Sequence, residues 1–190
     1  MGVIATISSS PSTTSRTDAV LADVSRRVQR AGHVVAPLVL RDLPPAALLQ
    51  ADTTDPQIAA AVDTIAAADA VVVSTPVYKA AYGGLLKVFL DLLPQFALRD
   101  KVVLPLATGG SPAHVLAVDY ALRPVLASLA ASSITPGWFV LASQVNVFDD
   151  GEVLLDQSAA GPLKEVTDVF LDVVAGRSLL RLATVREAVA

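Results

Sequence analysis

The chain has 190 residues, of which 53% are hydrophobic and only 5% aromatic, so we expect one domain with an aliphatic core and an apolar surplus that favours a homo-oligomer. The formal net charge is -4 and the Lys and Arg residues are scattered, which argues against nucleic-acid binding. The absence of cysteine excludes disulfides and thiolate catalysis, and the two distant histidines, His33 and His114, predict no metal site.

The N-terminal segment and the longest apolar runs indicate the localisation of the protein. It has no basic region typical of a secretory signal, and the chain has no unbroken apolar run of about 18 residues that would predict a membrane span. Gly2 and Thr6 fit the permissive myristoylation pattern, but a buried first strand accounts for the same residues. We therefore predict a cytoplasmic protein without membrane contact.

Short apolar runs alternate with helical patterns along the whole chain. The runs predict five strands, over Val3–Ile7, His33–Leu40, Ala70–Ser74, Val102–Ala107 and Trp138–Ser143. Helical spacing and start signals predict helices over Thr17–Ala31, Asp55–Ala68, Gly84–Leu93, Pro112–Ala131 with a bend at Pro124, and Leu163–Val174. A loop is expected at Pro44-Pro45 and a hairpin between Val145 and Leu155.

This alternation predicts an α/β fold, a flavodoxin-like three-layer sandwich with a five-stranded parallel sheet in the order 2-1-3-4-5 and helices on both faces. We expect residues 1–176 to form the domain and residues 177–190 a C-terminal tail. In this order strands 1, 3 and 4 are neighbours. The connections after them, the first loop (Ser8–Arg16), the second loop (Ser74–Gly84) and the third loop (Ala107–His114), should therefore meet at one sheet edge and form the site.

The first loop reads SSSPSTTSR and places seven hydroxyl groups ahead of a helix N-terminus. Backbone N–H groups and the helix dipole favour an anion there, and Arg16 adds a positive charge suited to phosphate oxygens. Helix capping by Ser and Thr is the simpler alternative for any single residue. Neither a Walker A loop nor a dinucleotide fingerprint is present, so we predict that hydroxyls bind a terminal phosphate.

The second and third loops could hold a flat ring. In the second loop Pro76 stiffens the chain, and Val77 and Tyr78 can lie against a heterocycle, although ordinary packing would also account for Tyr78 and solvation for Lys79. In the third loop, Thr108-Gly109-Gly110-Ser111 offers backbone groups to the rim of such a ring. Ser111 and His114 do not form a hydrolase elbow, and His114 is expected to orient the loop or touch the ring.

A ligand with a phosphate at the first loop and a flat ring between the second and third loops would be a mononucleotide. A flavin fits best, because its ring needs two walls. Asp119 and Tyr120 are unusual in an apolar helical stretch, and they could reach the site, pair across a subunit interface, or face solvent.

The strings TPVYKAAYGGLLK (Thr75–Lys87), LLP (Leu92–Pro94) and KVVLPLATGGSPAHVLAVDYALRPVL (Lys101–Leu126) resemble one known family. These are the NADPH-dependent FMN reductases of two-component alkanesulfonate monooxygenase systems, within the flavodoxin-like reductase superfamily. The similarity covers residues 1 to about 145. The family's glycine and arginine in the first loop are replaced here by Ser9 and Ser12, which should weaken contacts to phosphate or NADPH.

The resemblance implies a set of site residues. Ser10, Ser15, Arg16 and Thr17 match the phosphate loop, Pro76 to Lys79 match the second flavin-contacting loop, and Thr108 to Ser111 match the third. Tyr120 falls where this subgroup carries an inserted tyrosine that bulges the helix into a π-turn at a tetramer interface, with Asp119 beside it.

The implied activity is hydride transfer from NADPH to FMN, which would supply reduced flavin to a partner monooxygenase. Solvent can provide the proton, so we assign no catalytic residue. A homo-oligomer, dimer or tetramer, is expected. Two alternatives stay open: an electron carrier of the flavodoxin type, and a quinone or azo reductase with tightly bound FMN.

Overall fold

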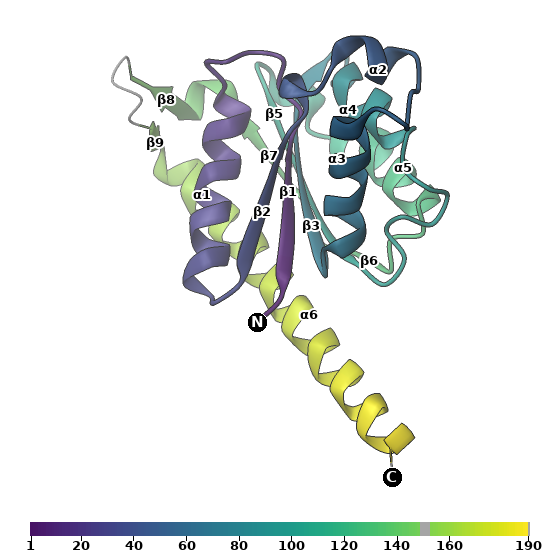
Figure 1. The fold of residues 1–190 in the computed structure, drawn as a ribbon. Helices are drawn as coiled ribbons and strands as arrows, with labels where there is room; N and C mark the ends of the chain where they lie inside the picture. The colour runs from purple at the N-terminus through teal and green to yellow at the C-terminus, as the bar shows by residue number, and fades with distance from the viewer. Residues whose placement is uncertain (149–152, 190) are drawn as a thin grey trace.

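The structure, a computed structural model that describes residues 1–148 and 153–189, has a parallel sheet between two layers of helices (Figure 1). The main strands are β1 (Val3–Ser8), β2 (Val34–Val39), β3 (Ala70–Tyr78), β5 (Val102–Gly109), β6 (Ser133–Ile134) and β7 (Trp138–Leu141). They pair in parallel in the order β2-β1-β3-β5-β6, and β7 also pairs with β5. The predicted flavodoxin-like order is confirmed, with β5 in the fourth place and the short β6 and β7 sharing the fifth.

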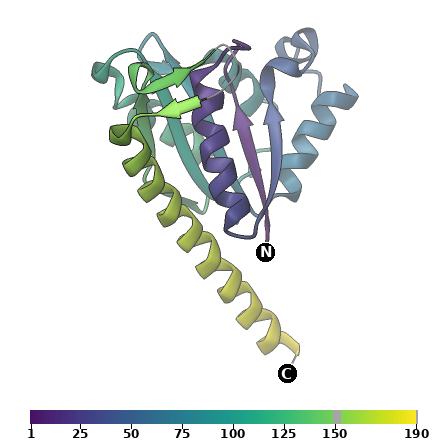
Figure 2. The same ribbon diagram turned by 90° about the vertical axis from the view of Figure 1, so that its left-hand side faces the viewer.

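Helices cover both faces of this sheet (Figures 1 and 2). One face carries α1 (Arg16–Arg30) and α6 (Gln157–Val189), and the other carries α2 (Pro45–Leu49), α3 (Pro56–Ala67), α4 (Gly84–Leu90) and α5 (Arg123–Ser128). Successive β3 residues alternate between the two cores, Val71 and Val73 on the α3–α5 side and Ala70 and Val72 on the α1–α6 side. Because both sides are packed, the strand is a continuous apolar run.

Capping contacts explain where two helices begin and end. The α1 N-cap is Ser15, whose Oγ accepts a hydrogen bond of 3.1 Å from the Asp18 amide. The α3 N-cap is Asp55, which precedes Pro56 as the sequence predicts. At the other end of α3, the ammonium of buried Lys101 donates to the carbonyls of Ala66 (3.0 Å) and Ala68 (2.5 Å). The lysine thereby complements the negative end of the helix dipole.

Several predicted boundaries on the α3–α5 side are wrong. The Pro44-Pro45 segment is the start of helix α2, because proline at the first helical position loses no intrahelical bond. Helix α4 ends at Leu90 and does not reach Leu93, because the chain passes into turns before Pro94. The single bent helix expected over Pro112–Ala131 consists of the 3-10 turn η2 (Pro112–His114), the π-helix η3 (Val118–Leu122) and α5, with Pro124 in the first turn of α5, where it is tolerated.

The second loop also differs from the expectation of a polar turn after Ser74. Strand β3 continues to Tyr78 because its last residues pair with the antiparallel strand β4 (Ala81–Tyr82), Val77 with Tyr82 and Tyr78 with Ala81. The turn is therefore only two residues long. Both of them, Lys79 and Ala80, have positive φ angles, 50° and 64°. A two-residue hairpin needs this conformation, which glycine and asparagine adopt more readily than alanine or lysine.

The C-terminal part contains a small separate hairpin and the longest helix. Strands β8 (Val145–Val147) and β9 (Val153–Leu155) confirm the predicted hairpin, whose Asp149-Asp150-Gly151 turn lies outside the described residues. Helix α6 starts earlier and ends later than the predicted Leu163–Val174 helix, and Figure 2 shows its C-terminal part extending away from the body. The division into a domain of residues 1–176 and a tail stays a prediction.

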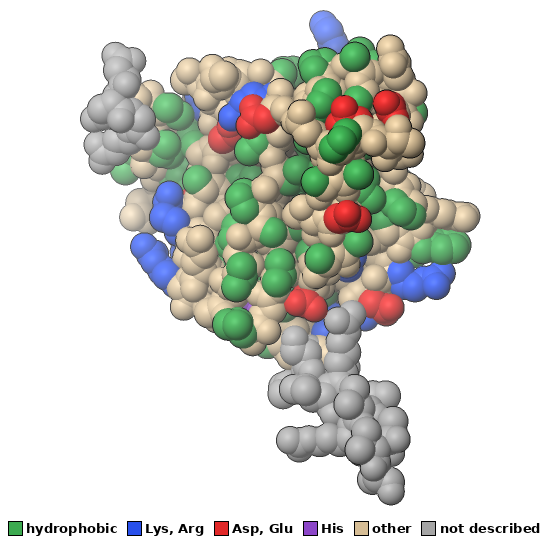
Figure 3. All heavy atoms as spheres, viewed as in Figure 1, with side chains coloured by type: hydrophobic (Ala, Val, Ile, Leu, Met, Phe, Trp, Pro, Cys, Tyr) green, Lys and Arg blue, Asp and Glu red, His purple; other side chains and the backbone are tan. Residues whose placement is uncertain are grey.

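The surface carries charges of both signs. Figure 3 shows acidic and basic side chains in small separate groups on the face seen in Figure 1. Over the residues that the structure describes, no helix combines the length and the apolar character that crossing a membrane requires.

Replacing Ala80 with glycine should stabilise the protein, because glycine adopts the positive φ of this turn without steric cost. We expect Ala80→Gly to raise the free energy of unfolding, measured by urea denaturation, by about 1 kcal/mol. Ala81→Gly is the matched control, and it should lower the same free energy by about 0.5–1 kcal/mol because its residue is in a strand. A loss of stability in Ala80→Gly would show that the turn is not strained.

Candidate functional site

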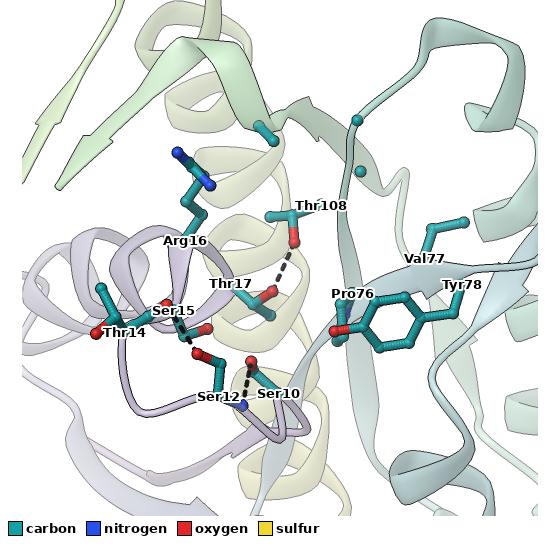
Figure 4. Close-up of a pocket in the computed structure, with 13 residues that line it drawn as sticks. Ser10, Ser12, Thr14, Ser15, Arg16, Thr17, Pro76, Val77, Tyr78 and Thr108 are labelled. Atoms are coloured by element: carbon teal, nitrogen blue, oxygen red, sulfur yellow. Dashed lines mark hydrogen bonds between the residues drawn. The ribbon is translucent and has the colours of Figure 1, made fainter.

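A cavity of about 230 Å³ lies at the carboxyl edge of the sheet, where β1, β3 and β5 end (Figure 4). All three predicted loops contribute to it. Ten of the thirteen predicted binding residues line it, namely Ser10, Ser15, Arg16, Thr17, Pro76, Val77, Tyr78, Thr108, Gly109 and Gly110. Ser12, Thr14 and Ala142 complete the lining. The topology therefore brings together residues that are far apart in the chain, from Ser10 to Ala142.

The hydroxyls of the first loop divide into two groups. Ser8 and Ser9 build the loop, because the Ser8 Oγ donates to the Asp18 carboxylate and the buried Ser9 Oγ donates to the Ser74 carbonyl at 3.0 Å. Others face the cavity, and there the Ser12 amide donates to the Ser10 Oγ at 3.3 Å. Only part of the hydroxyl-rich string is thus available to a ligand.

Arg41 braces the first loop, which the sequence did not indicate. It lies in the turn after β2, and its Nη1 donates both to the Asp18 Oδ2 at 2.6 Å and to the Ser10 carbonyl at 3.4 Å. The Asp18 carboxylate, in the first turn of α1, is therefore neutralised by an ion pair. This pairing matters because an unpaired carboxylate would oppose anion binding at the helix N-terminus. A lone arginine outside the three loops gives no sequence signal for such a role.

The start of α1 offers donors for an anion. Within the described parts of the chain, the backbone N–H groups of Arg16 and Thr17 have no hydrogen-bond acceptor, as expected for the first residues of a helix. The exposed Arg16 side chain lies at the rim, where its Nε donates to the Val145 carbonyl at 3.2 Å. Figure 4 shows this side chain directed away from Ser10 and Ser12. The site therefore presents amides and hydroxyls to an anion and holds the guanidinium beside it.

A buried pair of threonines joins the first and third loops. The Oγ1 atoms of Thr17 and Thr108 are 2.6 Å apart, and both residues are at most 5% exposed. The Ser74 Oγ donates to the Thr17 carbonyl at 3.2 Å, so the end of β3 joins the same network. These bonds fix the three loops relative to one another.

The second loop forms an apolar wall of the cavity. Val77 is buried, whereas Tyr78 is 53% exposed, and Figure 4 shows the Tyr78 side chain facing the first loop across the cavity. The Thr75 Oγ1 accepts a hydrogen bond of 3.0 Å from the Gly83 amide and thereby closes the base of the β3–β4 hairpin. Burial raises the pKa of the Tyr82 phenol on β4, which therefore stays neutral and packs against the core.

The third loop contains a glycine that the fold requires. A Cβ on Gly109 would lie 2.7 Å from Cζ of the Phe139 ring, so no side chain fits there. A Cβ on Gly110 would meet nothing within 4 Å, so the fold itself leaves room for a side chain at this position. The ring of Phe139 on β7 thus supports the backbone that lines the cavity.

Three predicted binding residues do not line the cavity. Lys79 is exposed in the hairpin turn, and the Ser111 Oγ accepts from the Ala113 amide and so caps η2. His114 ends η2, and its backbone amide donates to the Ser111 carbonyl at 3.2 Å. Their contact with a ligand stays a prediction.

The predicted π-turn is present. The π-helix η3 contains both Asp119 and Tyr120, and the Tyr120 side chain is 77% exposed. Arg123 anchors this segment, because its Nε donates to the Asp119 Oδ1 at 3.1 Å and its Nη atoms donate to the carbonyls of Ile134 and Thr135. The bulge is therefore fixed to the edge of the sheet, and Tyr120 projects from it.

Comparison with known proteins agrees with this architecture. The family model for NADPH-dependent FMN reductase matches residues 3–146. An FMN reductase (NADPH) of Pseudomonas putida is 46% identical over 143 residues, which cover 75% of this chain and 73% of that protein. The NADH-dependent FMN reductase SfnF of Pseudomonas fluorescens is 36% identical over 135 residues, 70% of each chain. The crystal structure of the NADH:FMN oxidoreductase EMOB in its apo form has a TM-score of 0.81 and 43% identity, and the match covers 90% of this chain and 88% of that one.

The match over residues 3–146 spans all the strands of the parallel sheet and all three loops of the cavity. The chain belongs to the NADPH-dependent FMN reductase family. The predicted family, the oxidoreductase class, and FMN and NADPH as the cofactors of that class are thereby confirmed.

Removing one hydroxyl of the threonine pair should destabilise the fold. We expect Thr17→Val to lower the free energy of unfolding by about 1–3 kcal/mol, because the Thr108 hydroxyl stays buried without its partner. The control is the double variant Thr17→Val, Thr108→Val, which removes both hydroxyls and should recover part of this loss in a urea titration. Additive losses from the two substitutions would show that the two side chains do not interact.

Proposed function

We propose that the chain reduces FMN with NADPH in the cavity between the three loops, and that the reduced FMN passes to a flavin-dependent monooxygenase. The observation that carries the proposal is the meeting of a helix N-terminus rich in hydroxyls with an apolar wall in a single cavity. A mononucleotide has the same division into an anionic end and a flat ring.

The first loop fits a phosphate. The N–H groups of Arg16 and Thr17, the hydroxyls of Ser10 and Ser12, and the positive end of the α1 dipole all favour a dianion at this position. The pairing of Asp18 with Arg41 neutralises a carboxylate in the first turn of α1 that would otherwise repel the phosphate. This site would hold the phosphate of FMN.

The second and third loops fit a ring. Val77 and Tyr78 supply an apolar face, and the backbone at Gly109 and Gly110 approaches without side chains. The cavity volume of about 230 Å³ is below the range of roughly 300–1,000 Å³ usual for ligand sites. A bound ring would therefore extend over the exposed Tyr78 toward solvent or a second subunit.

When bound, the flavin supplies the hydride-accepting chemistry. The protein's own residues bind the phosphate, fix the ring plane and leave one face of the ring open to a nicotinamide. None of these roles requires a side chain to donate or accept a proton, since solvent reaches the open cavity. The proposed reaction therefore needs no catalytic acid or base from the protein.

A group of exposed apolar side chains supports a homo-oligomer, dimer or tetramer. Val115, Leu116 and Tyr120 are all about half exposed or more, and they lie together on the η2–η3 segment. A group of apolar side chains so near the site is typical of a subunit interface. Asp119 and Tyr120 would then act at the interface and influence the release of FMN.

The monooxygenase partner is inferred from the relatives. One relative is named NADH-dependent FMN reductase SfnF, and the strings Thr75–Lys87 and Lys101–Leu126 resemble the reductases of two-component alkanesulfonate monooxygenase systems. The names of the relatives include both NADPH and NADH, so the preference of this chain for NADPH belongs to the proposal. A cytoplasmic location, which also belongs to the proposal, would suit an enzyme that uses FMN and NADPH.

An NADPH oxidation assay tests the activity. The purified chain should oxidise NADPH only after FMN is added, and the rate should saturate with FMN. A protein that is yellow and inert toward added FMN would be an electron carrier. If a quinone, rather than FMN, determined the rate, the chain would be a quinone reductase with resident flavin.

Arg16→Ala tests the phosphate site. The Arg16 guanidinium points away from Ser10 and Ser12, but its positive charge lies beside the proposed phosphate site, and loss of this charge should raise the KM for FMN by about fivefold to tenfold. The KM for riboflavin, which has no phosphate, should not change. Arg26→Ala, on the same helix and away from the cavity, is the matched control. An unchanged KM for FMN in Arg16→Ala contradicts phosphate binding at the first loop.

Deletion of Tyr120 tests the π-helix. Without the extra residue, η3 should become a regular helix, and FMN should dissociate less readily, with a Kd lower by about tenfold, or 1.4 kcal/mol. FMN titration by fluorescence and the flavin content after gel filtration measure this. Tyr120→Phe keeps the residue count and should behave like the parent. A deletion variant that releases FMN as easily as the parent excludes this role.

A further inference from the structure

The ion pair between Arg41 and Asp18 stands behind the first loop and outside the cavity. Arg41 belongs to the 3-10 turn η1 (Leu40–Asp42), which follows β2, and Asp18 lies in the first turn of α1. The Arg41 Nη1 is 2.6 Å from the Asp18 Oδ2, and the two side chains are only 21% and 27% exposed. Neither residue lines the cavity. The pair therefore influences a bound ligand only through the loop and through its charges.

Both members of the pair are bonded to the first loop. The Arg41 Nη1 also donates to the Ser10 carbonyl at 3.4 Å, so this carbonyl faces a cation outside the cavity. The Asp18 carboxylate accepts from the Ser8 hydroxyl, and the Asp18 amide donates to the Ser15 Oγ at 3.1 Å. The beginning and the end of the loop are thus tied to the same ion pair.

The pair also determines the charge behind the anion site. The Asp18 carboxylate lies in the turn whose amides would face a phosphate, and Arg41 compensates its negative charge. The Ser8 hydroxyl, which also donates to this carboxylate, carries no charge. A second carboxylate near Arg41, that of Asp42, is 4.0 Å from its Nε and 72% exposed, so water screens it. Loss of Arg41 would therefore leave the Asp18 charge uncompensated beside the proposed phosphate position.

We propose that Arg41 is a positioning residue that makes the site selective for FMN over riboflavin. It acts through Asp18, whose charge it neutralises, and through Ser10, whose carbonyl it holds away from the phosphate. Riboflavin is FMN without the phosphate, so neither effect should alter its binding. The inference deepens the proposed function and rests on it, because it needs the flavin phosphate at the first loop.

Titration with oxidised FMN and with riboflavin, followed by the change in flavin fluorescence, tests this without turnover. Arg41→Gln should raise the Kd for FMN by about tenfold and leave the Kd for riboflavin unchanged. Adding Asp18→Asn to this variant removes the uncompensated carboxylate and should return the Kd for FMN to within about threefold of the parent value. Arg41→Lys keeps the positive charge and should keep most of the preference for FMN.

Arg27→Gln is the matched control. Arg27 pairs with Asp23 at 2.7 Å on the same helix, the two side chains are 25% and 18% exposed, and neither residue lines the cavity. This substitution should change neither Kd. Urea denaturation establishes that each variant is folded. The double variant of Arg41 and Asp18 has no unpaired charge, so its preference for FMN remains a test if Arg41→Gln alone does not fold.

The outcomes separate the two proposals. If the wild-type chain binds no FMN, the proposed function fails and this inference fails with it. If FMN binds but Arg41→Gln changes neither Kd, or weakens FMN and riboflavin equally, only the inference fails. A double variant that binds FMN as weakly as Arg41→Gln would assign the effect to direct attraction between Arg41 and the phosphate. That result would overturn the role through Asp18.

Discussion

The parallel register of β1, β3 and β5 is the constraint on which the site depends. Ser8 pairs with Ser74, and Ser74 pairs with Leu106, so the three strands reach the same edge together. Each strand then passes into a loop, and the loops meet because neighbouring parallel strands deliver their carboxyl ends to one place. The Thr17–Thr108 contact and the bonds to Ser74 hold the meeting point. The pairing of the strands thus determines where the cavity lies, and the residues of the loops determine what lines it.

The hydroxyl groups of the first loop differ in what they contact: some form hydrogen bonds within the protein, and others line the cavity. Ser8, Ser9 and Ser15 are satisfied within the protein, by a carboxylate, a carbonyl and a helix amide respectively. Buried hydroxyls need such partners, since an unpaired one carries a desolvation penalty. Ser10, Ser12 and Thr14 line the cavity, although the Ser12 Oγ also donates to the Thr14 carbonyl at 3.1 Å. Part of the hydroxyl-rich first loop is therefore used in hydrogen bonds within the protein, and only the remainder is available to a ligand.

The sequence predicted the fold class, the strand order and the meeting of the three loops around one cavity, because continuous apolar strands and helix start signals are local features. It did not predict that β3 continues to Tyr78, since that depends on pairing with β4 and on an unusual Lys79-Ala80 turn. Arg41 was missed because its partners Ser10 and Asp18 are far away in the chain. The π-helix was anticipated only through family resemblance, because no local propensity marks the insertion at Tyr120.

The contact between Gly109 and Phe139 affects how mutational scans of this edge are read. A side chain at position 109 would collide with the Phe139 ring on β7, which is not among the residues that line the cavity. A Gly109 variant that loses activity would therefore report displaced backbone, not a missing ligand contact. Trimming Phe139 alongside it separates the two explanations, since relieved crowding would restore only the first kind of defect.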